Sequence, residues 1–209
     1  MISALICDFG GVLTTPLLRG FLAYQEQTGV TVEEFGKALG RAADADGVHP
    51  LYALERGEIS EADFGRRLAA ELDADFDVEH MRSLYFGHLE PNREMIEFVR
   101  ELRGDGLRTA LCTNNVREWE PLWRAKLPEI DEVFEVVVDS AFVGTRKPER
   151  RIYEITLERL GGVTAEQCVF VDDLDVNCQA AAELGMQAVR FEDAAVAISE
   201  VRGILSGGG

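Results

Sequence analysis

The sequence is poor in basic residues and contains no cluster of them. It has 38 Asp and Glu against 21 Lys and Arg, which gives a formal net charge of -17. A charge of this size repels nucleic acid and anionic membranes unless a local patch reverses the field, and no run of Lys or Arg does so. We therefore expect neither as a partner. Acidity also does not attract phosphorylated molecules, so any anion site must be built locally from backbone amides, a metal ion and a few cations.

Cysteine is scarce, and the four cysteines lack the spacing of a metal site. Cys7, Cys112, Cys168 and Cys178 form no CxxC pair, and three of them lie in or at the end of apolar runs. We interpret them as reduced core cysteines of a cytoplasmic protein. Residues 1–7 also lack a basic stretch followed by a long apolar region, so the sequence predicts neither a signal peptide nor a transmembrane span.

Five short apolar runs are bounded by turn residues and read as buried strands. They cover residues 4–7, 109–112, 135–138, 168–171 and 187–191. Between the later runs lie segments with apolar residues at helical spacing, such as Met95, Val99 and Leu102. Parallel strands need a crossover that covers the face of the sheet, and helices provide it. The sequence therefore predicts an α/β fold with a doubly wound parallel sheet, like a Rossmann core.

Residues 15–89 interrupt this alternation with an almost wholly helical pattern. Thr31 with Glu34 and Ser60 with Asp63 have the spacing of helix capping boxes. We expect three parts: residues 1–14 as the first strand and loop of the core, residues 15–89 as an inserted helical cap domain, and residues 90–209 as the rest of the core.

Polar residues follow directly after several of the predicted strands. Asp8 follows the first, Thr113-Asn114-Asn115 the second and Asp172-Asp173 the fourth, while Lys147 lies in the loop after the third. In such sheets ligands bind at the carboxyl ends of the strands. Carboxylates hold Mg²⁺, lysine and backbone amides hold phosphoryl oxygens, and a carboxylate can itself be the nucleophile. The sequence thus predicts a phosphate and metal site at this edge.

Four segments resemble, in order and spacing, the motifs of the haloacid dehalogenase superfamily. They are LICDFGGVL, ALCTNN, VGTRKPERRIYE and VFVDDLDVNCQAAAELGM, which together span nearly the whole chain. The resemblance is closest to members with a small helical cap after the first motif, including the phosphatase domain of some epoxide hydrolases and bacterial sugar-phosphate phosphatases. The stretch LERGEISEADF in the predicted cap is similar to that subgroup as well.

The resemblance implies a magnesium-dependent phosphohydrolase. Asp8 would be the nucleophile that forms an aspartyl-phosphate, and Mg²⁺ would be held by Asp8, Asp173 and the backbone carbonyl of Gly10. Asp172 and Asn177 would influence the metal site without being among its direct ligands. Two anions, the carboxylate and the phosphate, approach only when cations screen them.

The resemblance also implies which residues hold the phosphoryl group. Thr113 and the amide of Asn114 would bind its oxygens, and Lys147 would offset charge between the nucleophile and the phosphate. The substrate would be a small phosphorylated metabolite, with sugar phosphates among the candidates. One sequence indicates neither the individual substrate nor the oligomeric state.

Gly10 departs from the pattern of the family. Most phosphatases of the superfamily carry an aspartate at this position, which protonates the leaving group, and such assistance is worth roughly 10²–10⁴ in rate. Three explanations stay open. The substrate has a good leaving group; Thr14, Thr15 or His49 of the cap substitutes for the acid; or the protein binds phosphorylated ligands without turnover.

A 2-haloacid dehalogenase on the same scaffold is a further alternative. Those enzymes use no metal and usually carry a bulky aromatic residue where Gly10 stands. The Asp172-Asp173 pair and the glycine therefore both count against this function.

Overall fold

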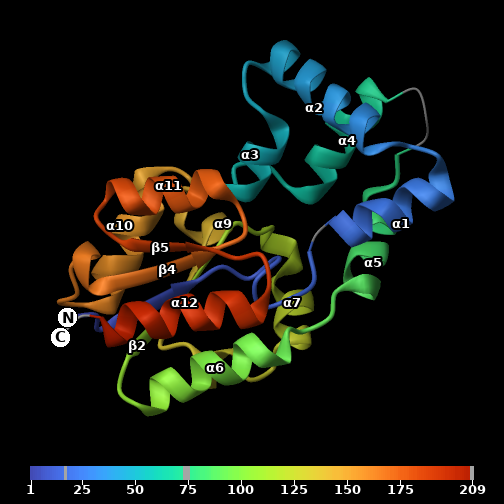
Figure 1. Cartoon of the computed structure of the whole chain (residues 1–209). Coiled ribbons are helices and arrows are strands. Elements are labelled where there is room, and N and C mark those ends of the chain that lie inside the picture. The colour runs from blue at the N-terminus through green and yellow to red at the C-terminus, as the bar shows by residue number, and fades with distance from the viewer. Residues whose placement is uncertain (17, 73–75, 208–209) are drawn as a thin grey trace.

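A parallel five-stranded sheet forms the centre of the protein (Figure 1). The computed structural model describes residues 1–16, 18–72 and 76–207. The strand order is β3-β2-β1-β4-β5. The strand bounds are β1 Ala4–Cys7, β2 Arg108–Thr113, β3 Val136–Asp139, β4 Cys168–Asp172 and β5 Gln187–Arg190. The predicted α/β fold is confirmed, and each predicted strand is present with its ends shifted by one residue at most.

Helices cover both faces of the sheet (Figure 1). On one face lie α6 (Arg93–Gly104) and α12 (Ala194–Ser206), and the short helices α7 (Glu120–Lys126) and α8 (Ile130–Val133) join the same core. On the other face lie α10 (Arg150–Leu160) and α11 (Asp175–Glu183). The remaining core elements are α9 (Ser140–Val143) and two short 3₁₀ helices at Arg117–Trp119 and Ala165–Gln167.

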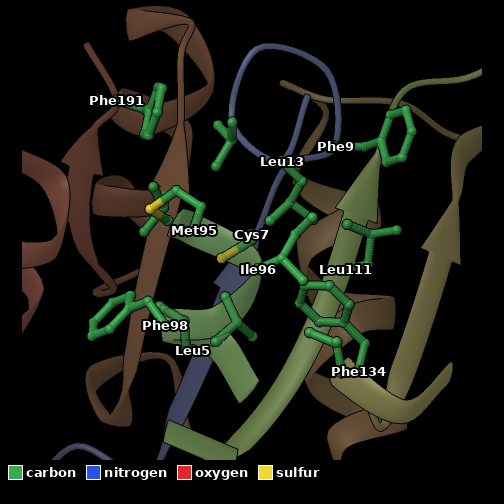
Figure 2. Close-up of a cluster of buried hydrophobic side chains, with 14 of the residues drawn as sticks. Leu5, Cys7, Phe9, Leu13, Met95, Ile96, Phe98, Leu111, Phe134 and Phe191 are labelled. Carbon is green, nitrogen blue, oxygen red and sulfur yellow. The ribbon is translucent and has the colours of Figure 1, made fainter. Parts of the chain in front are cut away.

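Alternate residues of β1 point into the two apolar layers. Leu5 and Cys7 pack with residues of α6 such as Met95, as Figure 2 shows. Ala4 and Ile6 belong to the opposite layer, with residues of α10. A strand buried on both faces must be apolar at every position, which is why β1 lacks a polar alternation. All four cysteines are free and buried, as predicted.

Among the described residues between β1 and α6, the chain forms five helices, which we call the helical cap. They are α1 Leu18–Thr28, α2 Val32–Asp46, α3 Pro50–Glu55, α4 Glu61–Glu71 and α5 Val78–His88. They pack around an apolar cluster of their own that includes Phe35, Phe64 and Leu68. Both predicted capping boxes are present, at the starts of α2 and α4. No helix of the described residues is both long and apolar enough to cross a membrane.

The two segments that connect the core to the cap run side by side. The backbone amide of Thr15 donates to the carbonyl of Glu90 at 2.9 Å, and that of Asn92 donates to the carbonyl of Leu13 at 2.8 Å. The chain enters the cap from the carboxyl end of β1, so the cap lies beside that edge of the sheet (Figure 1). We keep residues 15–89 as the proposed bounds of the cap domain, between the core segments 1–14 and 90–209.

Candidate active site

Three carboxylates and one lysine meet at the carboxyl edge of the sheet. The Nζ atom of Lys147 lies 2.6 Å from Oδ1 of Asp8 and 2.6 Å from Oδ2 of Asp172. Carboxylate oxygens of Asp8, Asp172 and Asp173 lie within 4.8 Å of one another. Residues from positions 8, 147 and 172–173 of the chain are therefore brought together, as the sequence predicted.

Strand pairing places the acidic residues next to each other. β1 and β4 are neighbours in register, with Cys7 opposite Val171, so Asp8 and Asp172 leave the sheet side by side. The backbone amide of Asp8 donates to the carbonyl of Val171 at 2.9 Å. Gly11 has a φ of 84°, and a Cβ atom on it would lie 2.4 Å from Oδ2 of Asp173. The tight approach of this loop to Asp173 therefore requires glycine.

Both oxygens of Asp172 are occupied by protein donors. Oδ2 accepts from Lys147, and Oδ1 accepts from Nδ2 of Asn177 and from the amide of Leu174, each at 2.9 Å. Asp173 is half-buried and forms no ion pair within the described ranges 1–16, 18–72 and 76–207. Asp172 is thus a fixed support for Lys147, and Asp173 is the carboxylate that is available to a ligand.

The side chain of Asn114, directly after β2, binds the backbone of Lys147. Oδ1 of Asn114 accepts from the backbone amide of Lys147 at 2.7 Å, and Nδ2 donates to the carbonyl of Lys147 at 2.9 Å. Its side chain therefore holds the loop that carries Lys147. Thr113 is buried at the end of β2, and its hydroxyl lies 3.5 Å from the carbonyl of Asn114.

Ser140, which the sequence did not suggest as a site residue, supports the loop that follows β2. Its hydroxyl accepts from the backbone amide of Asn115 at 3.0 Å. Its neighbour Asp139 ends β3 beside Thr113 and accepts from the amide of Ala141 at 3.0 Å. A serine directly after a strand was the available signal, but nothing in the sequence pointed to its partner.

Burial and mutual repulsion shape the charges of the cluster. Burial raises the pKa of Asp8 to about 7, with Lys147 opposing the rise and Asp172 adding to it. Burial and the charge of Asp172 also raise the pKa of Asp173. Burial lowers the pKa of Lys147, but the carboxylates of Asp172 and Asp8 outweigh it, so the pKa is raised above its usual range. Three carboxylates against one ammonium leave an excess of negative charge.

This donor set fits a hard divalent cation. Mg²⁺ prefers oxygen ligands and is usually bound through one or two carboxylates. Asp8 and Asp173 supply such carboxylates on adjacent loops, and Gly10 lies in the chain between Asp8 and Gly11, the residue that approaches Asp173. The excess of negative charge would be offset by the ion.

Of the residues suggested as substitutes for the missing acid, the two threonines donate to backbone carbonyls, whereas the buried Nδ1 of His49 has no hydrogen-bond partner among the described residues. The hydroxyl of Thr14 donates to the carbonyl of Phe9 at 3.3 Å, and that of Thr15 donates to the carbonyl of His88 at 3.0 Å. The ring of His49 stacks on Tyr52 with centroids 4.1 Å apart. Burial and the nearby Arg146 lower its pKa.

An aromatic residue of the cap, Tyr85, packs against the apolar cluster of the core. Burial and the charge of Asp8 raise the pKa of its phenol. The ring of Tyr85 stacks on Trp119 with centroids 5.3 Å apart. Nε1 of Trp119 in turn donates to Oε1 of Glu61 at 2.6 Å, so a core tryptophan joins two cap helices.

A cavity of about 530 Å³ opens beside Asp173, along the segments that connect core and cap. Its lining includes Thr14, Pro91, Asp173 and Arg190. Of the three carboxylates in the cluster, Asp173 is the one that lines this cavity.

The fold and the site define an α/β enzyme whose acidic residues and lysine meet at the carboxyl edge of a parallel sheet. The family model described as haloacid dehalogenase-like hydrolase matches residues 2–185. The chain therefore belongs to the haloacid dehalogenase-like hydrolases, and the resemblance of its motifs to that superfamily is confirmed.

Individual relatives agree with this assignment. The chain is 25% identical over 208 residues to bifunctional epoxide hydrolase 2 of Rattus norvegicus, covering 93% of this chain but 37% of that protein. It is 26% identical over 209 residues to the sesquiterpene phosphatase astK of Aspergillus oryzae, covering 95% of this chain and 94% of that protein. The chain thus spans well under half of the first relative and nearly all of the second.

A solved structure shows the same fold. A HAD-like family hydrolase from Porphyromonas gingivalis superimposes with a TM-score of 0.75 at 22% identity, covering 98% of both chains. The agreement extends over the sheet and the cap together, because it leaves almost none of either chain unmatched.

Proposed function

We propose that this protein is a magnesium-dependent phosphohydrolase that removes the phosphoryl group from a small phosphorylated metabolite, through an aspartyl-phosphate on Asp8. One observation carries the proposal: Lys147, buried with 1% of its side chain exposed, contacts the carboxylate of Asp8 at 2.6 Å while Asp173 stands beside them. The phosphatase among the relatives supports a phosphate ester as the substrate.

In the first step an oxygen of Asp8 bonds to phosphorus and the bond from phosphorus to the leaving oxygen breaks. The leaving oxygen keeps the electron pair and takes a proton from solvent, because Gly10 offers no acid. Lys147 and the amide after Thr113 offset the charge on the phosphoryl oxygens. A Mg²⁺ held by Asp8, Asp173 and the Gly10 carbonyl would supply the remaining positive charge.

In the second step water attacks phosphorus and the bond from phosphorus to the Asp8 oxygen breaks. Inorganic phosphate leaves and the carboxylate is restored, so atoms and charges balance over the cycle. Without an acid at position 10, esters with good leaving groups should react best. Anomeric sugar phosphates and acyl phosphates meet this requirement, and we infer that the natural substrate is of this kind.

The test is hydrolysis of an aryl phosphate, whose leaving group needs little protonation. We expect turnover that a chelator abolishes and Mg²⁺ restores, and that Asp8→Asn reduces by at least about 10³-fold. Glu183→Gln, on the exposed side of α11, is the matched control and should keep full activity. Mass spectrometry of acid-quenched protein should show one added phosphoryl group on Asp8.

Two other outcomes would replace the proposal. Release of halide from a 2-haloacid, unaffected by chelator, would assign the protein as a dehalogenase. Saturable binding of a phosphate ester without turnover would make it a phospho-ligand-binding protein.

A further inference from the structure

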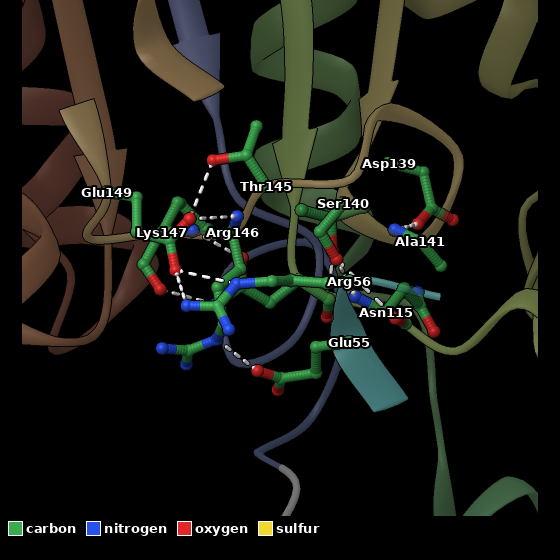
Figure 3. A network of polar contacts seen from close by, with 12 residues as sticks. Glu55, Arg56, Asn115, Asp139, Ser140, Ala141, Thr145, Arg146, Lys147 and Glu149 are labelled. Carbon is green, nitrogen blue, oxygen red and sulfur yellow. Dashed lines mark hydrogen bonds and ion pairs between the residues drawn. The ribbon is translucent and has the colours of Figure 1, made fainter. Parts of the chain in front are cut away.

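Two ion pairs join the end of α3 in the cap to the loop that carries Lys147. Nε of Arg146 donates to Oε2 of Glu55 at 2.5 Å, and Nε of Arg56 donates to Oε1 of Glu149 at 2.9 Å (Figure 3). The pairs cross 91 and 93 residues of sequence. We call these four residues the latch: Glu55 and Arg56 on the cap, Arg146 and Glu149 on the core.

One of the two pairs of the latch, Arg146 with Glu55, is less exposed than ordinary surface ion pairs of this protein, while Arg56 and Glu149 are partly exposed. The side chains of Arg146 and Glu55 are 14% and 15% exposed, whereas those of the pair Arg151 and Glu158 are 53% and 60% exposed. Exposed pairs contribute little because water screens them, and screening weakens with burial. The guanidinium of Arg146 also lies 4.1 Å from the ring centroid of Tyr52, a second contact with the cap.

The order of charges sets one register between cap and core. Glu55 and Arg56 are adjacent and opposite in sign, and their partners Arg146 and Glu149 are also opposite in sign and flank Lys147. A shift of the cap that broke either pair would leave a partly buried charge without a partner, which costs more than the pair itself contributes. The pairs therefore favour a single docked position of α3.

Further hydrogen bonds connect the latch to the backbone around Lys147. Oε2 of Glu149 accepts from the hydroxyl of Thr145 at 2.8 Å, which braces the loop just before Lys147. On the opposite side the amide group of Asn114 bonds both the backbone N–H and the carbonyl of Lys147. The backbone on either side of Lys147 is thus held by Asn114, which follows β2, and by Glu149, which is paired with Arg56 of the cap.

We propose that Glu55 and Arg56 are positioning residues for Lys147, so that docking of the cap on the core and placement of Nζ against Asp8 are a single event. The catalytic consequence rests on the proposed phosphohydrolase function. A group displaced by about 1 Å can cost roughly 10²-fold in rate, so a loop held from both sides has a clear use. The cap would then complete the active site only when α3 is docked.

The position of Lys147 can be measured without turnover, because the chain contains only three lysines: Lys37, Lys126 and Lys147. Acetic anhydride acylates accessible amines, and mass spectrometry reads each site. In the wild type Lys147 should react far more slowly than Lys37, whose side chain is 62% exposed. In the double variant Glu55→Gln/Arg56→Gln we expect acylation of Lys147 to rise by at least about fivefold through local opening of the loop.

Controls separate positioning from a general loss of stability. Arg41→Gln removes the ion pair of Arg41 with Glu71 inside the cap and should leave acylation of Lys147 unchanged. Glu55→Arg places like charges together and should increase it. Adding Arg146→Glu to that variant exchanges the charges and should restore protection.

Activity provides the second measurement. In the double variant kcat on an aryl phosphate should fall roughly ten- to a hundredfold while KM changes less than about threefold. The inference is overturned if acylation of Lys147 is unchanged in the folded double variant, rises equally in Arg41→Gln, or is not restored by charge exchange. Absence of wild-type turnover would instead overturn the proposed function, because acylation does not depend on it.

Discussion

Asp139 is a buried carboxyl group at the end of β3, with 5% of its surface exposed. One of its oxygens caps α9, while Oδ2 is buried and has no hydrogen-bond partner among the described residues. Burial raises its pKa from 3.8 to about 7; the amide of Ala141 opposes the rise and the charge of Glu120 adds to it. Asparagine keeps the capping oxygen and removes the charge, so Asp139→Asn isolates the effect of ionisation.

Whether stability rises or falls with pH depends on which state, folded or unfolded, holds the proton of Asp139. Between pH 3.8 and about pH 7 the folded protein keeps a proton that the unfolded chain has released. The free energy of unfolding contributed by this group therefore falls as pH rises, by about 1.4 kcal/mol per pH unit, and levels off above the folded pKa. From about pH 5.5 to about pH 8 the wild type should lose about 2 kcal/mol that Asp139→Asn does not lose.

Urea unfolding of both proteins at the two pH values measures this difference. Glu183→Gln, which removes an exposed acid, is the control and should follow the wild type. Comparing variant with wild type cancels the other titrating groups. An equal loss of stability in Asp139→Asn and the wild type would show that this carboxyl is not forced to hold its proton by burial, and the reasoning would be refuted.

Three further substitutions test the site and the cap. Gly11→Ala should displace Asp173, because the new Cβ would lie 2.4 Å from its Oδ2, and should weaken Mg²⁺ activation at least about tenfold in a metal titration. Gly10→Asp should restore an acid and raise turnover of alkyl relative to aryl phosphates by roughly 10- to 10²-fold; an unchanged ratio would contradict this. Trp119→Phe should remove the bond to Glu61 and cost about 1–3 kcal/mol in urea unfolding.

The strands could be predicted because each is a short apolar run closed by turn residues. The exact ends of the strands could not be predicted, because hydrogen bonding between neighbouring strands determines where each strand begins and ends. β3 begins at Val136, opposite Ala110, and ends at Asp139, opposite Thr113, one residue later than the apolar run suggested. The shift places Asp139 in the sheet beside Thr113, a position that its charge alone argued against.

The meeting of Asp8, Lys147 and Asp173 was predictable for a topological reason. Carboxyl ends of parallel strands share one edge, so polar residues that follow different strands converge there. Contacts made by the cap were not predictable in this way. The sequence offered no partner for Glu55 or Arg56, because the residues that pair with them lie more than 90 positions away.

The arrangement of charge around Lys147 explains how a protein with a net charge of -17 would bind an anionic ester. Arg146, next to Lys147 in the chain, and Arg56 of the cap are each paired with a glutamate in the latch. Lys147 itself is shared between two carboxylates, while Asp173 adds further negative charge. These three cations are thus committed to holding the site together, whereas Arg190 lines the cavity beside Asp173 and forms no ion pair among the described residues. Attraction of a phosphate would then come chiefly from a bound divalent ion and oriented backbone amides, with Arg190 as the additional uncommitted cation. Binding of the ester should therefore depend on the metal as strongly as turnover does, since the same ion provides most of the uncommitted positive charge.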